Sequence, residues 1–317
     1  MTPATLPVEA PPTVWPPRRA VTAWLFFDWS AQPFFTLVTT FVFAPFFASA
    51  LAKDAADGQA LWGYATGFAG LCIALLSPLL GGIADRTGPR KPWIAAFGAL
   101  LVIGSAMLWF AVPGSAAAVP IALAGFVIAT VGAEFATTFN NAMMTRLVPP
   151  ERLGWLSGTG WAIGYLGGLL SLAITLGLLA ADPQTGKTLI GIAPILGLDA
   201  AAREGDRFSG PLTALWFIIF VTPMFLLTPD SGRTGLSLAE AAKGGVGRLK
   251  DTLGELPKLP SLGRFLIANM IYQDALVALF AFGGIYAAGV FGWQTIELGI
   301  FGILLTVTGT LGAWAGG

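Results

Sequence analysis

The stretch GGIADRTGPRK, residues 81–91, separates two apolar stretches at 61–84 and 92–112. Each apolar stretch has the ~20 residues that a helix needs to cross a bilayer. Within the polar stretch, Gly88 can adopt the left-handed conformation that a tight turn requires. Asp85 is placed to cap or face a helix N-terminus. The segment therefore predicts a short turn between two antiparallel membrane helices.

The composition of the whole chain agrees with this interpretation. Of the 317 residues, 55% are hydrophobic and 11% are charged, and the mean hydropathy is +0.75. An ordinary soluble domain has ~25% charged residues. The net charge of zero provides no basic face for nucleic acid. We therefore expect a helical membrane protein with several spans and no nucleic-acid partner.

Metal and disulfide chemistry have little support in the sequence. Cys72 is the single cysteine, which excludes an internal disulfide, and there is no histidine, the commonest metal ligand. No phosphate-binding G-x-x-x-x-G-K-[ST] loop is present. We predict no cofactor and no metal site.

Apolar stretches and loop signals divide the chain into eight predicted spans. They lie approximately at 20–51, 61–84, 92–112, 118–148, 154–181, 210–228, 263–290 and 294–317. With the N-terminus in the cytoplasm, thirteen of the 17 basic residues fall on the inside, Arg86, Arg90 and Lys91 among them. The other four lie outside: Lys53, Lys187, Arg203 and Arg207. The positive-inside rule therefore predicts a cytoplasmic N-terminus.

Two segments are not predicted to span the membrane. The proline-rich residues 1–19 are expected to be disordered. The long connection 229–262 carries Val246, Leu249, Leu253 and Leu256 at helical spacing, which predicts an amphipathic surface helix. The alternative is a linker without a function of its own.

The loop at 81–91 resembles a known signature. Gly81, Asp85, Arg86, Gly88 and Arg90 match the G-x-x-x-D-R-x-G-x-R/K pattern between helices two and three of the major facilitator superfamily, although Pro89 departs from the basic residue often found there. The resemblance implies twelve helices in two halves around a central cavity. It also implies a cytoplasmic gating loop, made here of Gly81, Asp85, Arg86, Gly88, Arg90 and Lys91.

Four further stretches resemble the unknown major facilitators, a group that includes the autophagy-related vacuolar amino-acid effluxers. They are FFDWSAQPFFTLVTTFVFAPFF in span one, NNAMMTRL in span four, LSGTGWAIGYLGGLLSL in span five and FLIANMIYQDAL in span seven. This resemblance implies a transporter of small polar solutes such as amino acids.

The two halves of the expected fold are not equally represented. Span two ends SPLLGGIAD, and span eight ends GAWAGG where the sequence stops. We therefore expect an all-α integral membrane protein with a major facilitator-type bundle and eight of twelve transmembrane helices. A six-helix half (20–228) and the linker (229–262) would precede the first two helices of the second half (263–317). The alternative is an independent eight-helix protein.

Three acidic residues, Asp28, Glu134 and Asp274, lie inside predicted spans. Counted from the flanking arginines at 1.5 Å per residue, they lie about 14–18 Å from the end of their helix, near the middle of a ~30 Å core. A charge there costs at least ~2.5–3.5 kcal/mol on insertion scales, so it normally faces the protein interior or water. Burial among apolar groups favours the neutral form of a carboxylic acid. We predict that Asp274 and either Asp28 or Glu134 carry protons; the alternative is a structural hydrogen bond at each.

Polar neighbours of these acids are predicted to line the transport cavity. Thr138 and Asn141 share a helical face with Glu134, and Gln32 and Thr39 share one with Asp28. Span five adds Trp161 and Tyr165, which line the cavity or simply pack. Its glycines at 154, 158, 160, 164, 167 and 168 allow close helix approach. GWAIGYLGG also resembles the antiporter motif of the superfamily, but Tyr165 replaces its proline and argues against that assignment.

These features predict a proton-coupled secondary transporter in a bacterial cell membrane, acting as a monomer by alternating access. Its partners would be protons, a small solute and the lipid bilayer. No lysine or arginine is expected to be buried within the predicted spans, which favours a cation, amine or zwitterion over an anion. The rival interpretations are a truncated membrane scaffold or sensor and an intramembrane enzyme, for which only the acids could serve.

Overall fold

The computed structural model describes residues 15–236, 240–242, 247, 254–291, 293 and 295–316. Within these residues the regular structure is helical, and the β-structure is one isolated bridge between Ala181 and Thr188. The α-helices are α1 (Arg18–Pro33), α2 (Phe43–Phe46), α3 (Ala55–Thr87), α4 (Lys91–Met107), α5 (Ala118–Asn141), α6 (Leu153–Ile174), α7 (Glu204–Leu227), α9 (Pro260–Phe291) and α10 (Thr295–Gly316).

Shorter helical segments extend or connect these helices. The π-type segments are η1 (Phe34–Phe41), η2 (Phe47–Leu51) and η6 (Thr175–Leu179). The 3-10 segments are η3 (Leu108–Phe110), η4 (Met144–Arg146), η5 (Pro150–Arg152), η7 (Ile195–Gly197) and η8 (Leu256–Lys258).

Seven helices in the described residues are long and apolar enough to cross a membrane. They run over Arg18–Leu51, Ala55–Thr87, Lys91–Phe110, Ala118–Arg146, Pro150–Leu179, Glu204–Leu227 and Pro260–Leu279. The eighth predicted span corresponds to α10, whose shorter apolar part is Ile300–Gly316. The prediction of an all-α membrane bundle is therefore confirmed.

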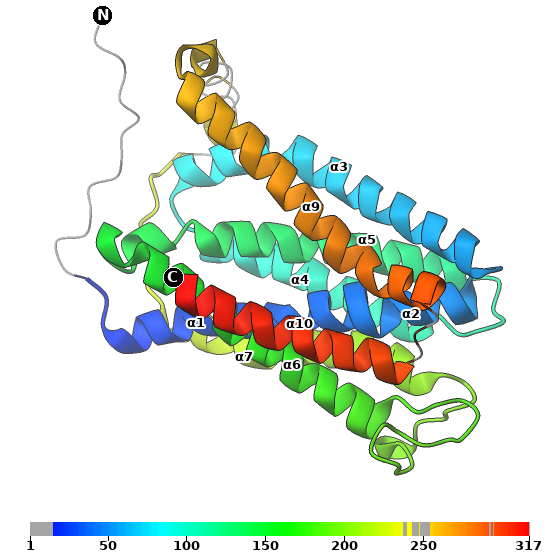
Figure 1. Ribbon diagram of the computed structural model, residues 1–317. Coiled ribbons are helices and arrows are strands. Elements are labelled where there is room, and N and C mark those ends of the chain that lie inside the picture. The colour runs from blue at the N-terminus through cyan, green and yellow to red at the C-terminus, as the bar shows by residue number, and fades with distance from the viewer. Residues whose placement is uncertain are drawn as a thin grey trace, which may run out of the picture.

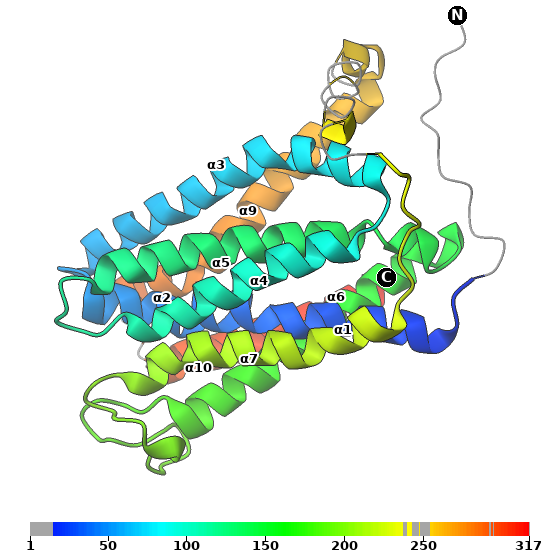
Figure 2. The ribbon, with the colours of Figure 1, turned by 180° about the vertical axis from the view of Figure 1, so that it is seen from behind.

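The helices lie side by side along one long direction, and α1 runs through their middle (Figure 1). It contacts α5, α6 and α7, while α4 packs between α5 and α7. Helices α9 and α10 lie on the opposite face of the bundle from α4 and α7, as the view from behind makes clear (Figure 2). Of these two, α10 packs against α6, whereas the apolar stretch of α9 is unburied along its length.

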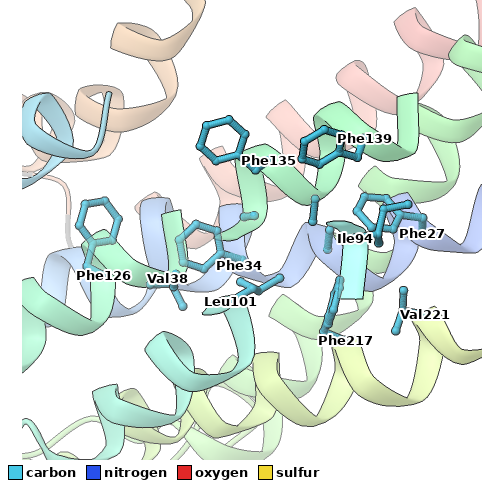
Figure 3. Packing of buried hydrophobic residues seen from close by; sticks show 14 of the residues in the cluster. Phe27, Phe34, Val38, Ile94, Leu101, Phe126, Phe135, Phe139, Phe217 and Val221 are labelled. Carbon is cyan, nitrogen blue, oxygen red and sulfur yellow. The ribbon is translucent and has the colours of Figure 1, made fainter. Parts of the chain in front are cut away.

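The core is aromatic and is shared by the first six membrane-length helices; part of it is drawn in Figure 3. The rings of Trp62 on α3 and Phe126 on α5 stack with their centroids 4.1 Å apart. Helices α1, α4, α5 and α7 each contribute large side chains that are almost completely buried. They include Phe27, Phe34, Ile94, Leu101, Phe126, Phe135, Phe139, Phe217 and Val221. These rings fix the positions of α1 and α5, the helices that carry Asp28 and Glu134.

Pro33 ends the regular part of α1. Proline has no backbone N–H, so the carbonyl of Trp29, four residues earlier, loses its usual helical partner. The indole N–H of Trp216 on α7 donates to this carbonyl at 3.0 Å. The chain then continues as the π-type segment Phe34–Phe41. The proline irregularity of α1 is therefore compensated by the neighbouring helix.

One predicted segment lies outside the described residues, and one predicted span begins earlier than expected. The surface helix predicted around Val246, Leu249 and Leu253 lies outside the described residues, which resume before Leu256 in η8. The sixth span, predicted from residue 210, begins as a helix at Glu204. Its acidic first turn explains the earlier start, because carboxylates stabilise a helix N-terminus.

Candidate functional site

Asp28 lies in the close contact between α1 and α6. The side chain is half-buried, and Gly160 and Gly164 of α6 face it. A Cβ atom built on Gly160 would lie 2.5 Å from Oδ2 of Asp28, and one on Gly164 would lie 3.2 Å from its Cβ. The absence of a side chain at these two positions therefore makes the space that the carboxylate occupies.

The same glycine face continues along α1 past Asp28. Gly167 packs against the backbone and ring of Trp29, and Gly168 packs against Gln32 and the hydroxyl of Thr36. Four of the six glycines of span five therefore serve the close packing of α6 against α1. Close packing is one of the two interpretations of these glycines, and the antiporter motif is the other. The glycine face also places Gln32, a predicted cavity residue, one turn from Asp28.

The Asp28 carboxylate has no hydrogen bond or ion pair within the described part of the chain. Its neighbour Trp24, one turn earlier, donates its indole N–H to the backbone carbonyl of Asn140 at 3.0 Å. Asn140 is fully buried, and neither atom of its side-chain amide has a partner among the described residues. Sequence reasoning selected Asn141 instead; the helical face of Glu134 pointed to position 141, while packing against Trp24 buries position 140.

Glu134 occupies the middle of α5 and is half-buried. The described residues supply no donor to its carboxylate; its backbone carbonyl accepts the Thr138 hydroxyl at 2.9 Å. Thr138 is exposed and Asn141 is half-buried at the end of the helix. The hydroxyl of Thr137 is buried without a partner among the described residues. The polar face expected on span four is present, but the described contacts do not join it to Asp28.

Asp274 differs from the other two acids in its surroundings. It is exposed on α9, and Met270, one turn earlier, is 56% exposed. The described structure does not bring Asp274 together with Asp28 or Glu134. Its place in a proton pathway stays a prediction.

Tyr165 lies on the side of α6 that faces α10, and Trp161 lies one turn before it. The Tyr165 ring is 3.2 Å from a Cβ position built on Gly309, so Tyr165 takes part in helix packing. Trp161 is 52% exposed, with its ring centroid 6.0 Å from that of Tyr165. Thr39 lies in η1, where its hydroxyl donates to the carbonyl of Phe34 at 3.4 Å. A cavity role for these residues stays a prediction.

Arg207 corrects the expectation that the spans contain no buried basic residue. Because α7 begins at Glu204, Arg207 lies in its first turns, where it is 4% exposed. Its guanidinium donates to the carbonyl of Trp109 at 2.8 Å and pairs with Glu204 at 3.5 Å. Since it lies near the helix end and is already paired, Arg207 offers no counter-charge at the depth of Asp28.

Gly88 forms the turn between α3 and α4, as the sequence predicts. Its φ is +96°, a conformation that side chains rarely adopt. A Cβ atom there would also collide with the carbonyl oxygen of Gly232, in the segment that follows α7. Gly81, by contrast, has open space around its Cβ position, and the described structure gives no steric reason for a glycine there.

Asp85 does not cap a helix N-terminus, which corrects the sequence interpretation. It lies in the last turns of α3 and accepts from the guanidinium of Arg90 at 2.6 Å. Arg90 also donates to the carbonyls of Ala84 and Gly88. Arg90 therefore closes the turn by binding the carbonyl end of α3.

The N-terminus of α4 is capped by Asp230, 140 residues away in sequence. Its two carboxylate oxygens accept the backbone N–H groups of Arg90 and Lys91 at 2.8 and 3.0 Å. The same segment donates from Thr234 to the carbonyls of Arg86 and Thr87. The start of the predicted linker is thus anchored on the loop that carries the signature.

The geometry defines a class of protein: an all-α integral membrane protein with unpaired acids inside closely packed helices. A model described as Major Facilitator Superfamily matches residues 3–172, and one described as Vacuole effluxer Atg22 like matches residues 151–316. Each match spans more than half of the 317 residues. The chain belongs to the major facilitator superfamily and carries an Atg22-like region, so it is a member of a transporter family and not an enzyme.

Individual relatives agree with this assignment. The chain is 28% identical over 206 residues to an uncharacterized MFS-type transporter, YxiO, of Bacillus subtilis (strain 168), with 64% of this chain and 45% of the relative covered. The fold is similar to that in the crystal structure of a D-xylose-proton symporter, with a TM-score of 0.57 at 16% identity. That match covers 92% of this chain and 65% of the symporter. The chain therefore spans less than two thirds of both.

Proposed function

We propose that this protein moves a small polar solute across a bacterial cell membrane by alternating access, and that a proton carried on Asp28 accompanies the solute. The observation that carries the proposal is the setting of Asp28. Its carboxylate is half-buried in α1, pressed against Gly160, and has no hydrogen-bond donor among the described residues.

This setting favours a proton carrier over a structural role. A buried acid that only joins two helices is expected to accept hydrogen bonds, because an unpaired buried polar group costs about 1–3 kcal/mol. Asp28 meets the glycine face of α6 instead. A group in this position can exchange a proton without breaking a helix-to-helix contact. Glu134, which also lacks a side-chain partner in the described residues, is the second candidate.

The charged side chains near Asp28 indicate which charge the solute carries. No basic side chain is found at the depth of Asp28 within the described helices, and Arg207 is paired near the end of α7. An amine or an amino acid, whose ammonium group Asp28 can attract, therefore fits better than an anion. We propose a cytoplasmic N-terminus because the positive-inside rule places thirteen of the 17 basic residues on that side.

The proposal can be tested with purified protein in liposomes. A panel of radiolabelled amino acids and amines is offered with an imposed pH gradient of either direction. We expect at least one solute to accumulate in the wild-type vesicles. Asp28→Asn, which keeps the shape of the side chain and removes the titrating group, should lose most of the gradient-driven accumulation.

A matched variant separates the charge at Asp28 from acidic charge in general. Asp57 is exposed in the first turn of α3, and Asp57→Asn should transport as the wild type does. Equal gradient dependence in Asp28→Asn and wild type would contradict the coupling. Failure of the wild type to move any solute would favour the rival interpretation, a membrane scaffold or sensor.

A further inference from the structure

A second site lies at the end of the bundle that holds the α3–α4 connection. A pocket of about 480 Å³ opens there between the start of α4 and the end of α7. It is lined by Pro89, Lys91, Pro92, Ala95, Phe225, Asp230, Ser231 and Arg233. Helices α4 and α7 lie on the face of the bundle away from α9 and α10, and the segment after α7 runs toward the end of α3 (Figure 2).

The pocket has two chemically different parts. Ala95 and Phe225 lie about one turn inside α4 and α7, and with Pro92 they form an apolar wall. Exposed apolar side chains continue along both helices beyond this wall. They include Leu100 and Ile103 on α4 and Leu215 and Ile219 on α7. The polar part, with Lys91 and Arg233, lies at the helix ends, where a membrane surface would be.

Asp230 attracts the Lys91 ammonium group, but it forms no salt bridge with Lys91 or Arg233 within the described residues. Both oxygens of that carboxylate accept backbone N–H groups at the start of α4. The positive end of the helix dipole therefore offsets its charge. Arg90, the residue before Lys91, is already paired with Asp85, and Arg146 donates to the hydroxyl of Ser231, which lines the pocket.

Lys91 and Arg233 keep donors for a ligand. The Lys91 ammonium group, which has three N–H donors, makes one hydrogen bond, to the carbonyl of Phe225 at 2.8 Å. Arg233 is exposed, and its guanidinium has no partner within the described residues. Two cationic side chains with unused donors thus indicate a site for an anion. This site adjoins an apolar wall at the ends of two membrane helices.

We propose that this pocket binds an anionic phospholipid, with Lys91 and Arg233 holding the headgroup phosphate and the acyl chains lying along α4 and α7. Basic pockets between helices at a membrane surface suit such headgroups, and each basic residue near the surface contributes to the attraction. A free phosphate would use the same cations but would leave the apolar wall uncovered.

The test measures lipid binding to the purified 317-residue chain in detergent by native mass spectrometry. The probes are dioleoyl phosphatidylglycerol, which is anionic, and dioleoyl phosphatidylcholine, which is zwitterionic with the same acyl chains. We expect the anionic lipid to bind more tightly. The double variant Lys91→Gln/Arg233→Gln should weaken its binding by about tenfold or more. The control Lys53→Gln/Lys187→Gln removes two exposed basic residues at the opposite end and should leave binding within about twofold.

Further variants and a competition with phosphate test the apolar wall and the two charges separately. Ala95→Trp fills the apolar wall from an exposed position without changing charge, and should also weaken the binding of the anionic lipid. Lys91→Arg/Arg233→Lys keeps both charges and should retain it. Inorganic phosphate at the same concentration should not displace the lipid. Equal binding of the two lipids, unchanged binding in the glutamine and tryptophan variants, or displacement by phosphate would each overturn the proposal.

Discussion

Gly160 is the residue through which α6 approaches Asp28. Because a Cβ atom there would lie 2.5 Å from the carboxylate oxygen, any side chain must displace Asp28 or separate the two helices. We predict that Gly160→Val lowers the free energy of unfolding by about 1–3 kcal/mol, the usual cost of overpacking. Thermal unfolding of the detergent-solubilised protein would measure it.

Gly67 on α3 provides the control for this substitution. It has open space around its Cβ position in the described structure. Gly67→Val should therefore change stability little compared with Gly160→Val. Equal effects of the two substitutions would show that the α1–α6 contact is looser than the glycine face indicates.

Asp182, in the loop between α6 and α7, gives a pH prediction outside the membrane-spanning helices. The backbone N–H groups of Thr185 and Gln184 donate to its carboxylate and hold the pKa of Asp182 below its ordinary value of 3.8. A lowered folded-state pKa contributes stability that is present above the unfolded-state pKa and is lost as the pH falls through the folded-state pKa.

We therefore predict that the turn 182–186 opens below about pH 4, the range set by the ordinary carboxyl pKa. Hydrogen exchange of its amides, divided by the intrinsic rate at each pH, should rise in that range. Asp182→Asn can keep the geometry without titrating, so its corrected rates should stay level. Identical pH dependence in both proteins would remove Asp182 from the explanation.

At the scale of elements, the turn between α3 and α4 depends on Gly88 for two reasons. Its positive φ disfavours a side chain, and the carbonyl of Gly232 occupies the position of a Cβ atom. Gly114 has a φ of +80° but open space around it. Both alanine substitutions incur the backbone cost of a positive φ, about 1–2 kcal/mol, and Gly88→Ala must also displace the segment after α7.

We predict that Gly88→Ala destabilises the protein more than Gly114→Ala does. Limited proteolysis after Arg233 should report the displaced segment, because Asp230 and Thr234 hold it against the turn. Equal protease resistance of the two variants would contradict the close approach of Gly232.

The sequence predicts helices well where the signal is local. Apolar length defines the spans, and the glycine at position 88 predicts its turn. The cap on α4 could not be predicted, because Asp230 reaches it from 140 residues away while Asp85, the nearer acid, pairs with Arg90. Periodicity gave the polar face of α5 but not the burial of Asn140, which depends on Trp24 of another helix.

Across the whole molecule, the first six membrane-length helices are packed differently from α9 and α10. The first six membrane-length helices share one aromatic core around α1. Helix α10 packs on α6 through Gly309 and Tyr165, whereas the apolar stretch of α9 in Pro260–Leu279 is unburied. Asp28 and Asp274, which the sequence places at similar depths in their spans, therefore have different surroundings in the described structure.

We propose that Asp28 carries the proton that accompanies the solute. The most direct measurement is proton movement itself, followed with a pH-sensitive dye trapped in liposomes when a transported solute is added without an imposed gradient. We predict solute-dependent proton flux for the wild type and Asp57→Asn, and none for Asp28→Asn. Solute-dependent proton flux in Asp28→Asn equal to that of the wild type would contradict the proposal.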